Sequence, residues 1–200
     1  MELIVISKPN FFKGEALLIN ELFESGMQRF HLRKEGSERR GYEQLLGNIK
    51  PEYLERVALH QFHEMAPDFG IQRLHFPEAK RKTGAHLPFS QSTHLTLSTS
   101  IHQTEQLTEL ENFKYTFYGP VFQSISKKDY PGTVDSDFRL PPAPGLKVIA
   151  LGGIDLEKTA LLKKMNFDGI AILGCLWNEP EQALKTFKKI LEKCQHKDLM

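Results

Sequence analysis

Eight short apolar segments recur along the 200-residue chain, and most of them are followed by a stretch in which apolar residues return at helical spacing. Their apolar runs are nearly continuous, so we expect strands that are buried on both faces, as in a parallel sheet. Eight such units predict one α/β domain, residues 1–200, folded as a closed (β/α)8 TIM barrel. An open doubly wound sheet is the alternative. The expected strands are residues 3–6, 28–32, 56–62, 71–76, 94–99, 114–122, 147–154 and 168–174.

The expected helices are uneven in length. Helical spacing is clear in the segment that stops at Gly26 and in the last segment, which carries Phe187 and Ile190. Residues 77–92 contain two prolines and a glycine, so we expect only a turn or a poor helix there. The length is at the low end for this fold, which predicts that the third and fourth helices are shortened. Residues 123–145 form a long loop rich in proline and glycine, which suits a lid.

Composition excludes several classes of partner. The chain has 26 Lys and Arg against 25 Asp and Glu, so no general field attracts nucleic acid or anionic lipid. No run approaches the roughly 18 apolar residues of a membrane span, and the N-terminal apolar stretch is shorter than a signal peptide requires. Cys175 and Cys194 are far apart, without a CxxC motif. We expect a cytoplasmic protein with reduced thiols; its oligomeric state stays open, with a homodimer as one alternative.

Two glycines follow the seventh expected strand, in the sequence ALGGID. Gly152 and Gly153 would let the backbone approach a phosphate closely, and the next helix would offer unpaired N–H groups, with Asp155 able to cap it. Gly174, after the eighth strand, would complete the cup, since the loops after strands seven and eight often hold phosphate in such barrels. The alternative is a tight turn without a ligand.

The stretch YGPVFQSISKKDYPG, residues 118–132, places two hydroxyls and two ammonium groups just past the sixth strand. Ser124, Ser126 and Lys127 are therefore either an anion cradle or a polar surface loop. Arg33 follows the second strand, and its planar fork matches phosphate or carboxylate. A salt bridge with Glu35 is the alternative for Arg33.

Several histidines stand at or near the ends of strands, but their spacing matches no compact ligand motif such as HExxH. We therefore predict no zinc site. Any of these histidines is a possible general base, because imidazole titrates near neutral pH. They are His31, His60, His63, His75 and His102.

Five motifs together resemble a known family. HLRKEG, STSIHQTEQ, YGPVFQSISKK, VIALGGID and GIAILG occur in the order and spacing of the thiamine phosphate synthase family, which also contains the similar thiazole tautomerases. The resemblance runs from the second strand to the eighth. Its strongest piece, GPVFxSxSK, is similar to the family's Gly-Pro-x-Phe-x-Thr-x-Thr-Lys, with serine in place of threonine twice.

The resemblance implies a transferase of thiamine biosynthesis. Such an enzyme joins hydroxymethylpyrimidine diphosphate to thiazole phosphate with Mg²⁺ and releases pyrophosphate. The resemblance implies catalytic roles for Arg33, Lys127 and His31. It places the diphosphate on Ser100, Ser124, Ser126, Lys127 and Arg33, and the thiazole phosphate on Gly152, Gly153 and Gly174.

The chain departs from the family pattern where the family binds its metal. The carboxylate-bearing positions after the third and fourth strands read His60, Gln61 and Lys80 here, so the ligands that hard Mg²⁺ prefers are missing. Three hypotheses follow. The chain is a divergent synthase in which Lys80 or Lys34 supplies the charge of the metal, or a tautomerase-like enzyme with His31, His60 or His102 as base, or a phosphate-ligand binder without catalysis.

Overall fold

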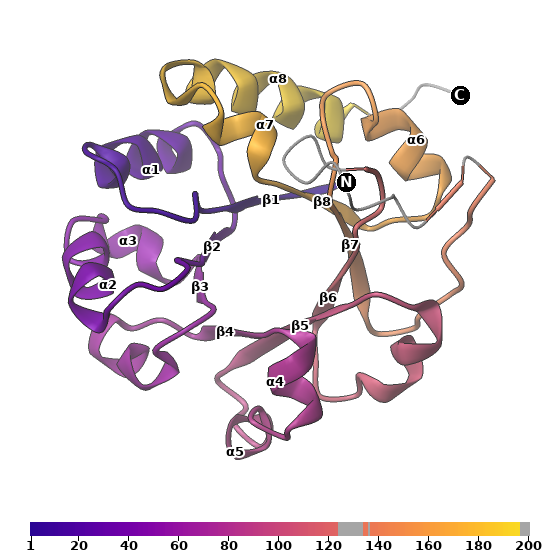
Figure 1. The fold of residues 1–200 in the computed structure, drawn as a ribbon, viewed down its shortest axis with the longest axis horizontal. Coiled ribbons are helices and arrows are strands. Elements are labelled where there is room, and N and C mark those ends of the chain that lie inside the picture. Colours follow the sequence, from indigo (N-terminus) through magenta and orange to yellow (C-terminus); the bar gives the residue numbers. More distant parts are fainter. Residues whose placement is uncertain (124–133, 136, 197–200) are drawn as a thin grey trace.

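The structure, a computed structural model, describes residues 1–123, 134–135 and 137–196. Eight parallel strands pair in sequence order, and β8 pairs back with β1, so that the sheet closes into a barrel with the helices outside it (Figure 1). The predicted TIM barrel is confirmed, and the open sheet is excluded by this closure. The strands are β1 Glu2–Ile6, β2 Phe30–Leu32, β3 Val57–Leu59, β4 Arg73–Phe76, β5 Thr96–Ile101, β6 Tyr115–Tyr118, β7 Lys147–Leu151 and β8 Gly169–Ile172.

The helices are mostly short. Only α1, α2 and α8 exceed six residues among the described α-helices. Within the part of the chain that the structure describes, no helix has the length and hydropathy to cross a membrane. The α-helices are α1 Glu15–Glu24, α2 Arg39–Leu46, α3 Pro51–Leu54, α4 Glu78–Lys82, α5 Leu87–Ser90, α6 Thr159–Lys164, α7 Gly174–Trp177 and α8 Ala183–Gln195. The 3₁₀ turns are η1 His63–Met65, η2 Pro67–Phe69, η3 Thr104–Glu109 and η4 Pro180–Gln182.

The predicted shortening of the third and fourth helices is confirmed. Only the two 3₁₀ turns η1 and η2 connect β3 to β4, and α4 and α5 after β4 are one turn each. The helix expected near 103–112 is instead the 3₁₀ turn η3. Pro67, Pro77 and Pro88 stand at the starts of η2, α4 and α5, where a missing N–H is tolerated, and they limit how far each helix extends backwards.

Two apolar layers hold the barrel together. A large cluster fills the space between the strands and the outer helices, where α8 contributes Phe187 and Ile190. A second, smaller cluster fills the barrel interior; its members are Ile4, Ile6, Tyr115, Phe117, Ile149 and Ala171. The interior is therefore a packed core, as is usual for this fold.

One side of the interior is polar, contrary to the expectation that the strand interiors stay apolar. His31 on β2 reaches across the barrel to the hydroxyl of Tyr115 on β6, with 2.8 Å between Nε2 and the oxygen. His75 on β4 and Ser98 on β5 are also buried, and they hydrogen-bond to each other. The interior thus has an apolar half near β7, β8 and β1 and an imidazole-rich half near β2 to β5.

Candidate active site at the carboxyl ends of the strands

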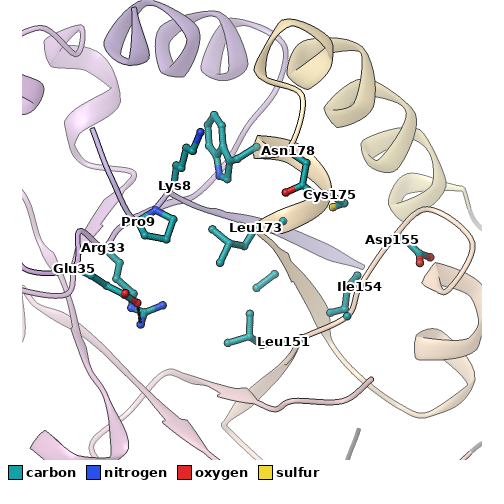
Figure 2. Close-up of a pocket in the computed structure, with 15 residues that line it drawn as sticks. Lys8, Pro9, Arg33, Glu35, Leu151, Ile154, Asp155, Leu173, Cys175 and Asn178 are labelled. Atoms are coloured by element: carbon teal, nitrogen blue, oxygen red, sulfur yellow. Dashed lines mark hydrogen bonds and ion pairs between the residues drawn. The ribbon is translucent and has the colours of Figure 1, made fainter. Parts of the chain in front are cut away.

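A pocket of about 370 Å³ opens at the carboxyl ends of β1, β2, β7 and β8. Figure 2 shows its labelled side chains, with Arg33 and Glu35 on one wall, Leu151 and Ile154 on the opposite one, and Leu173 between them. Four of the predicted site residues line it, namely Arg33, Gly152, Gly153 and Gly174. The active sites of TIM barrels lie at this end of the strands. The pocket is therefore the candidate site.

The backbone geometry at Gly152 and Gly153 requires glycine at both positions. Their φ angles are +100° and +63°, a left-handed conformation that residues with a side chain rarely adopt. A Cβ on Gly153 would come within 2.6 Å of the carbonyl oxygen of Gln123, and a Cβ on Gly152 would come within 2.8 Å of Cα of Pro120. Both glycines therefore serve a tight turn, and the same turn leaves their backbone open to the pocket.

The turn after β7 differs from the helix start that the sequence suggested. Helix α6 begins at Thr159, and no side chain caps it. Asp155 instead accepts hydrogen bonds from the backbone N–H groups of Glu157 and Lys158, at 3.1 and 3.2 Å. The prediction that Asp155 caps the helix itself is wrong. Those two N–H groups are satisfied within the turn, so an anion in the pocket would rely on the glycine backbone and on basic side chains.

Arg33 combines both of the roles considered for it. Its guanidinium lies 2.6 Å from Oε1 of Glu35, and the two side chains are 41 % and 59 % exposed. An exposed pair of this kind is weak, so Arg33 stays available to an anion in the pocket. Lys8, which follows β1, lines the same wall and adds a second cation.

If Lys34 supplied the charge of a missing metal, its ammonium group would have to lie in the pocket, and it does not. Its side chain is fully buried, with Nζ 2.5 Å from Oε1 of Glu15 and 2.9 Å from the carbonyl oxygen of Lys8. Burial lowers the pKa of Lys34, and the Glu15 partner opposes that shift. The hypothesis that Lys34 supplies the charge of a missing metal is therefore wrong. Lys80 is exposed on α4 and does not line the pocket.

His31 lies in the barrel interior and has no exposed surface. Its Nδ1 is 2.9 Å from Nε2 of His60, and its Nε2 is bonded to Tyr115. Burial lowers the pKa of His31 and of His60 well below the ordinary range, and it lowers the pKa of His75 to about 3. The three imidazoles are therefore neutral at pH 7, and His31 does not face the pocket directly.

Among the described histidines, His102 has the surroundings that suit an accessible general base. Its Nδ1 contacts the carbonyl oxygen of Gly119, and its Nε2 is 3.5 Å from a carboxylate oxygen of Glu78. Ser100 lies near it at the end of β5, where its hydroxyl accepts a hydrogen bond from the backbone N–H of Glu78. These residues flank the β4–β5 side of the mouth, away from the residues that line the pocket.

The predicted diphosphate residues Ser124, Ser126 and Lys127 lie outside the described residues, as do the other residues of 124–133 and residue 136 in the loop 123–145 that suited a lid. Their roles stay predictions. Among residues that the sequence did not single out, Lys8, Cys175 and Asn178 also line the pocket. The sequence did carry a signal for Lys8, because it lies two residues past the end of β1, just as Arg33 lies past the end of β2. Trp177 forms part of the wall, and its Nε1 donates to the carbonyl oxygen of Ile6 at 2.6 Å.

The described residues do not fit Mg²⁺. Carboxylates near the mouth already have cationic partners: Glu35 pairs with Arg33, and Glu78 pairs with Lys82. In the ranges that the structure describes, the one group of three or more potential ligands that converges is made of imidazole nitrogens, not oxygens. Mg²⁺ prefers oxygen ligands. We assign no step of a reaction to it.

The sequence matches one family model. The model is described as thiamine monophosphate synthase, and it covers residues 3–176. A thiamine-phosphate synthase from Methylobacillus flagellatus is 33 % identical over 63 residues, a match that spans 32 % of this chain and 30 % of the relative. The sequence match to this relative is thus local.

Solved structures extend the likeness to the whole chain. Thiamine phosphate pyrophosphorylase from Bacteroides thetaiotaomicron superposes with a TM-score of 0.75 and 25 % identity, covering 98 % of this chain and 100 % of that one. The enzyme of the same description from Pyrococcus furiosus gives the same TM-score at 17 % identity, with coverage of 97 % and 95 %. The second likeness concerns the fold alone.

Proposed function

Because the chain belongs to the thiamine monophosphate synthase family, we propose that it is a transferase of thiamine biosynthesis. Its reaction joins hydroxymethylpyrimidine diphosphate to thiazole phosphate. The thiazole nitrogen attacks the methylene carbon of the pyrimidine, the bond from that carbon to the diphosphate oxygen breaks, and pyrophosphate leaves.

One observation carries this proposal. The pocket brings the glycine turn after β7, the start of α7 at Gly174 and the guanidinium of Arg33 after β2 to one opening. The glycine side is shaped for the close approach of a phosphate, and the arginine side supplies a fork of donors. A substrate with a phosphate at one end and a reacting ring at the other would span the two sides.

Charge development explains why cations belong at this opening. The departing diphosphate gains negative charge in the transition state, and donors already aimed at it lower the barrier. Arg33 and Lys8 are the cationic residues that line the pocket. Ser100, Ser124, Ser126 and Lys127 complete the proposed diphosphate set from the β5 and β6 ends. The low-dielectric wall formed by Leu173 and Trp177 strengthens these interactions.

The test is a two-substrate assay scanned over Mg²⁺ concentration. The proposal expects thiamine phosphate and pyrophosphate to form, and Arg33→Gln to reduce kcat/KM by roughly 100-fold, since one charge-assisted contact in an active site is worth about 3 kcal/mol. Arg40→Gln is the matched control, because Arg40 is exposed on α2 and away from the pocket. Absence of product at every Mg²⁺ concentration contradicts the proposal.

A second function is acid–base isomerisation of a thiazole phosphate. The pairing of His102 with Glu78 favours it, because a neighbouring carboxylate orients the imidazole of a general base. Thiazole turnover that His102→Asn abolishes and His94→Asn leaves intact supports this function. Phosphate-ligand binding that stabilises the protein without any turnover identifies a non-catalytic binder instead.

A further inference from the structure

Three buried histidines converge in the barrel interior, outside the pocket. His31, His60 and His75 come from β2, from the end of β3 and from β4, and one ring nitrogen of each lies within 4.8 Å of the other two. The closest pair is Nδ1 of His31 and Nε2 of His60, at 2.9 Å. The rings of His60 and His75 stack with 4.0 Å between centroids. We propose that this trio is a binding site for a transition-metal ion of the zinc class.

The donor set selects the kind of ion. Neutral imidazole nitrogen is a preferred ligand of Zn²⁺ and of its neighbours Co²⁺, Ni²⁺ and Cu²⁺, whereas Mg²⁺ and Ca²⁺ take oxygen. Three histidines with a fourth position left to water is a common arrangement in zinc enzymes. No carboxylate belongs to the trio, so the net charge of an occupied site is that of the ion.

The surroundings of the trio resemble those of metal-bound histidines. Such residues usually hydrogen-bond through the ring nitrogen that does not hold the metal, which fixes the ring and its tautomer. Here Nε2 of His31 bonds to the hydroxyl of Tyr115 at 2.8 Å, and Nδ1 of His75 bonds to the hydroxyl of Ser98 at 3.0 Å. Both hydroxyls are themselves buried. The outer nitrogens of two ligands are therefore already held.

To bind an ion, the three nitrogens must move closer together, and the ion needs a route into the barrel interior. Three nitrogens bound at 2.0–2.1 Å in a tetrahedral arrangement are about 3.4 Å apart, so the widest pair of the trio must approach by up to roughly 1.4 Å. We expect rotation of the stacked His75 and His60 rings to supply this movement. His60 is the most exposed member at 9 %, and it gives the trio its contact with the mouth. Arg29, Arg73 and Arg33 are the cations whose charge acts on the trio; Arg29 pairs with Glu2 at 2.7 Å and Arg33 with Glu35 at 2.6 Å.

The proposal is independent of the proposed function, because binding is measured without either substrate. Metal-free protein, prepared with a chelator, is titrated with Co²⁺ and followed by visible absorption, and Zn²⁺ is then added as competitor. We expect about one equivalent of Co²⁺ with the intense bands of a four-coordinate nitrogen site, displaced by Zn²⁺. Isotope-edited NMR of the wild-type protein should place the Zn²⁺-induced ring shifts on His31, His60 and His75.

Variants separate a metal site from a hydrogen-bonded cluster. His60→Gln should weaken Co²⁺ binding by 100-fold or more, and Tyr115→Phe by about tenfold, because it removes the group that orients His31. His94→Asn is the control, since His94 is exposed and outside the trio. Wild-type protein that binds no Co²⁺, or whose Zn²⁺-induced shifts fall on other histidines, overturns the proposal. That readout needs no variant, so it stands even where His60→Gln fails to fold.

Discussion

Nζ of Lys34 lies 2.5 Å from Oε1 of Glu15, and both side chains are closed off from solvent. Lys34 follows β2 and Glu15 begins α1, so the pair ties the first crossover of the barrel to the second strand. Nζ also donates to the carbonyl oxygens of Lys8 and Asn10. Lys8 lines the pocket, so this buried pair holds one wall of the candidate site in position.

Removing one partner of this pair should destabilise the protein strongly. We expect Lys34→Met to lower the free energy of unfolding by about 3–5 kcal/mol, because it leaves the Glu15 carboxylate buried without a counter-ion. The double variant Glu15→Met, Lys34→Met should be less destabilised than the sum of the single variants. Urea unfolding measures both. Lys50→Met removes the exposed partner of Glu24 and should cost less than about 1 kcal/mol; equal losses for Lys34→Met and Lys50→Met would contradict the assignment.

Freeing Arg33 from Glu35 should strengthen anion binding. Glu35→Gln removes a negative charge from the mouth and leaves the guanidinium to the ligand. We expect inorganic phosphate to bind roughly 2–5 times more tightly, a change of about 0.4–1 kcal/mol. Arg33→Gln should have the opposite effect, by roughly tenfold. Calorimetric titration at low salt measures both variants, and an unchanged Kd in Glu35→Gln would show that Arg33 does not reach the anion.

Gly153→Ala should damage the site more than its backbone conformation alone explains. The new Cβ meets the carbonyl oxygen of Gln123 at 2.6 Å, so the turn must shift. We expect a loss of about 2–4 kcal/mol in stability together with loss of phosphate binding. Gly145→Ala is the matched control, with φ of +81° and no atom within 4 Å of its added Cβ. It should cost only about 1–2 kcal/mol and leave binding intact; similar losses of phosphate binding in both variants would refute a specific role for the turn.

Cys175 should react slowly with alkylating reagents, and a ligand should slow it further. Burial raises the pKa of this pocket-lining thiol to about 11. At pH 8 its thiolate fraction is then roughly 100-fold below that of a free cysteine, and labelling should accelerate about tenfold per pH unit until pH 11. Peptide mass spectrometry after iodoacetamide treatment separates it from Cys194. Phosphate beside Gly174 should protect Cys175 and leave Cys194 unaffected; protection of both would indicate global stabilisation.

Repetition along the chain made the architecture predictable. Each strand buries a continuous apolar run, and this signal survives in a single sequence because it depends on local composition. The two glycines after β7 and the arginine after β2 were identifiable for the same reason, since each lies at the end of a recognisable strand. The β7–α6 turn was less predictable, because three residues lie between Asp155 and Thr159, the first residue of α6.

The cluster of three imidazoles could not be predicted from the spacing of its histidines in the sequence. His31, His60 and His75 are 29 and 15 residues apart, and no local motif connects them. They meet only because β2, β3 and β4 are adjacent in the barrel, with His31 on β2, His60 one residue past the end of β3 and His75 on β4. The burial of Lys34 was equally hidden, since its partner Glu15 belongs to another crossover. Contacts between the strands and the segments that connect them depend on the pairing register of the strands, which a single sequence specifies only indirectly.

The pocket is assembled from the two extremes of the polypeptide. Residues 8, 9, 33 and 35 form one wall, residues 151–155, 171, 173–175, 177 and 178 form the rest, and the two groups meet through the pairing of β1 with β8. A nascent chain emerging from the ribosome therefore presents the basic wall long before the glycine wall has been synthesised. The pocket therefore binds its ligand only after β8 has been synthesised and has paired with β1 to close the barrel.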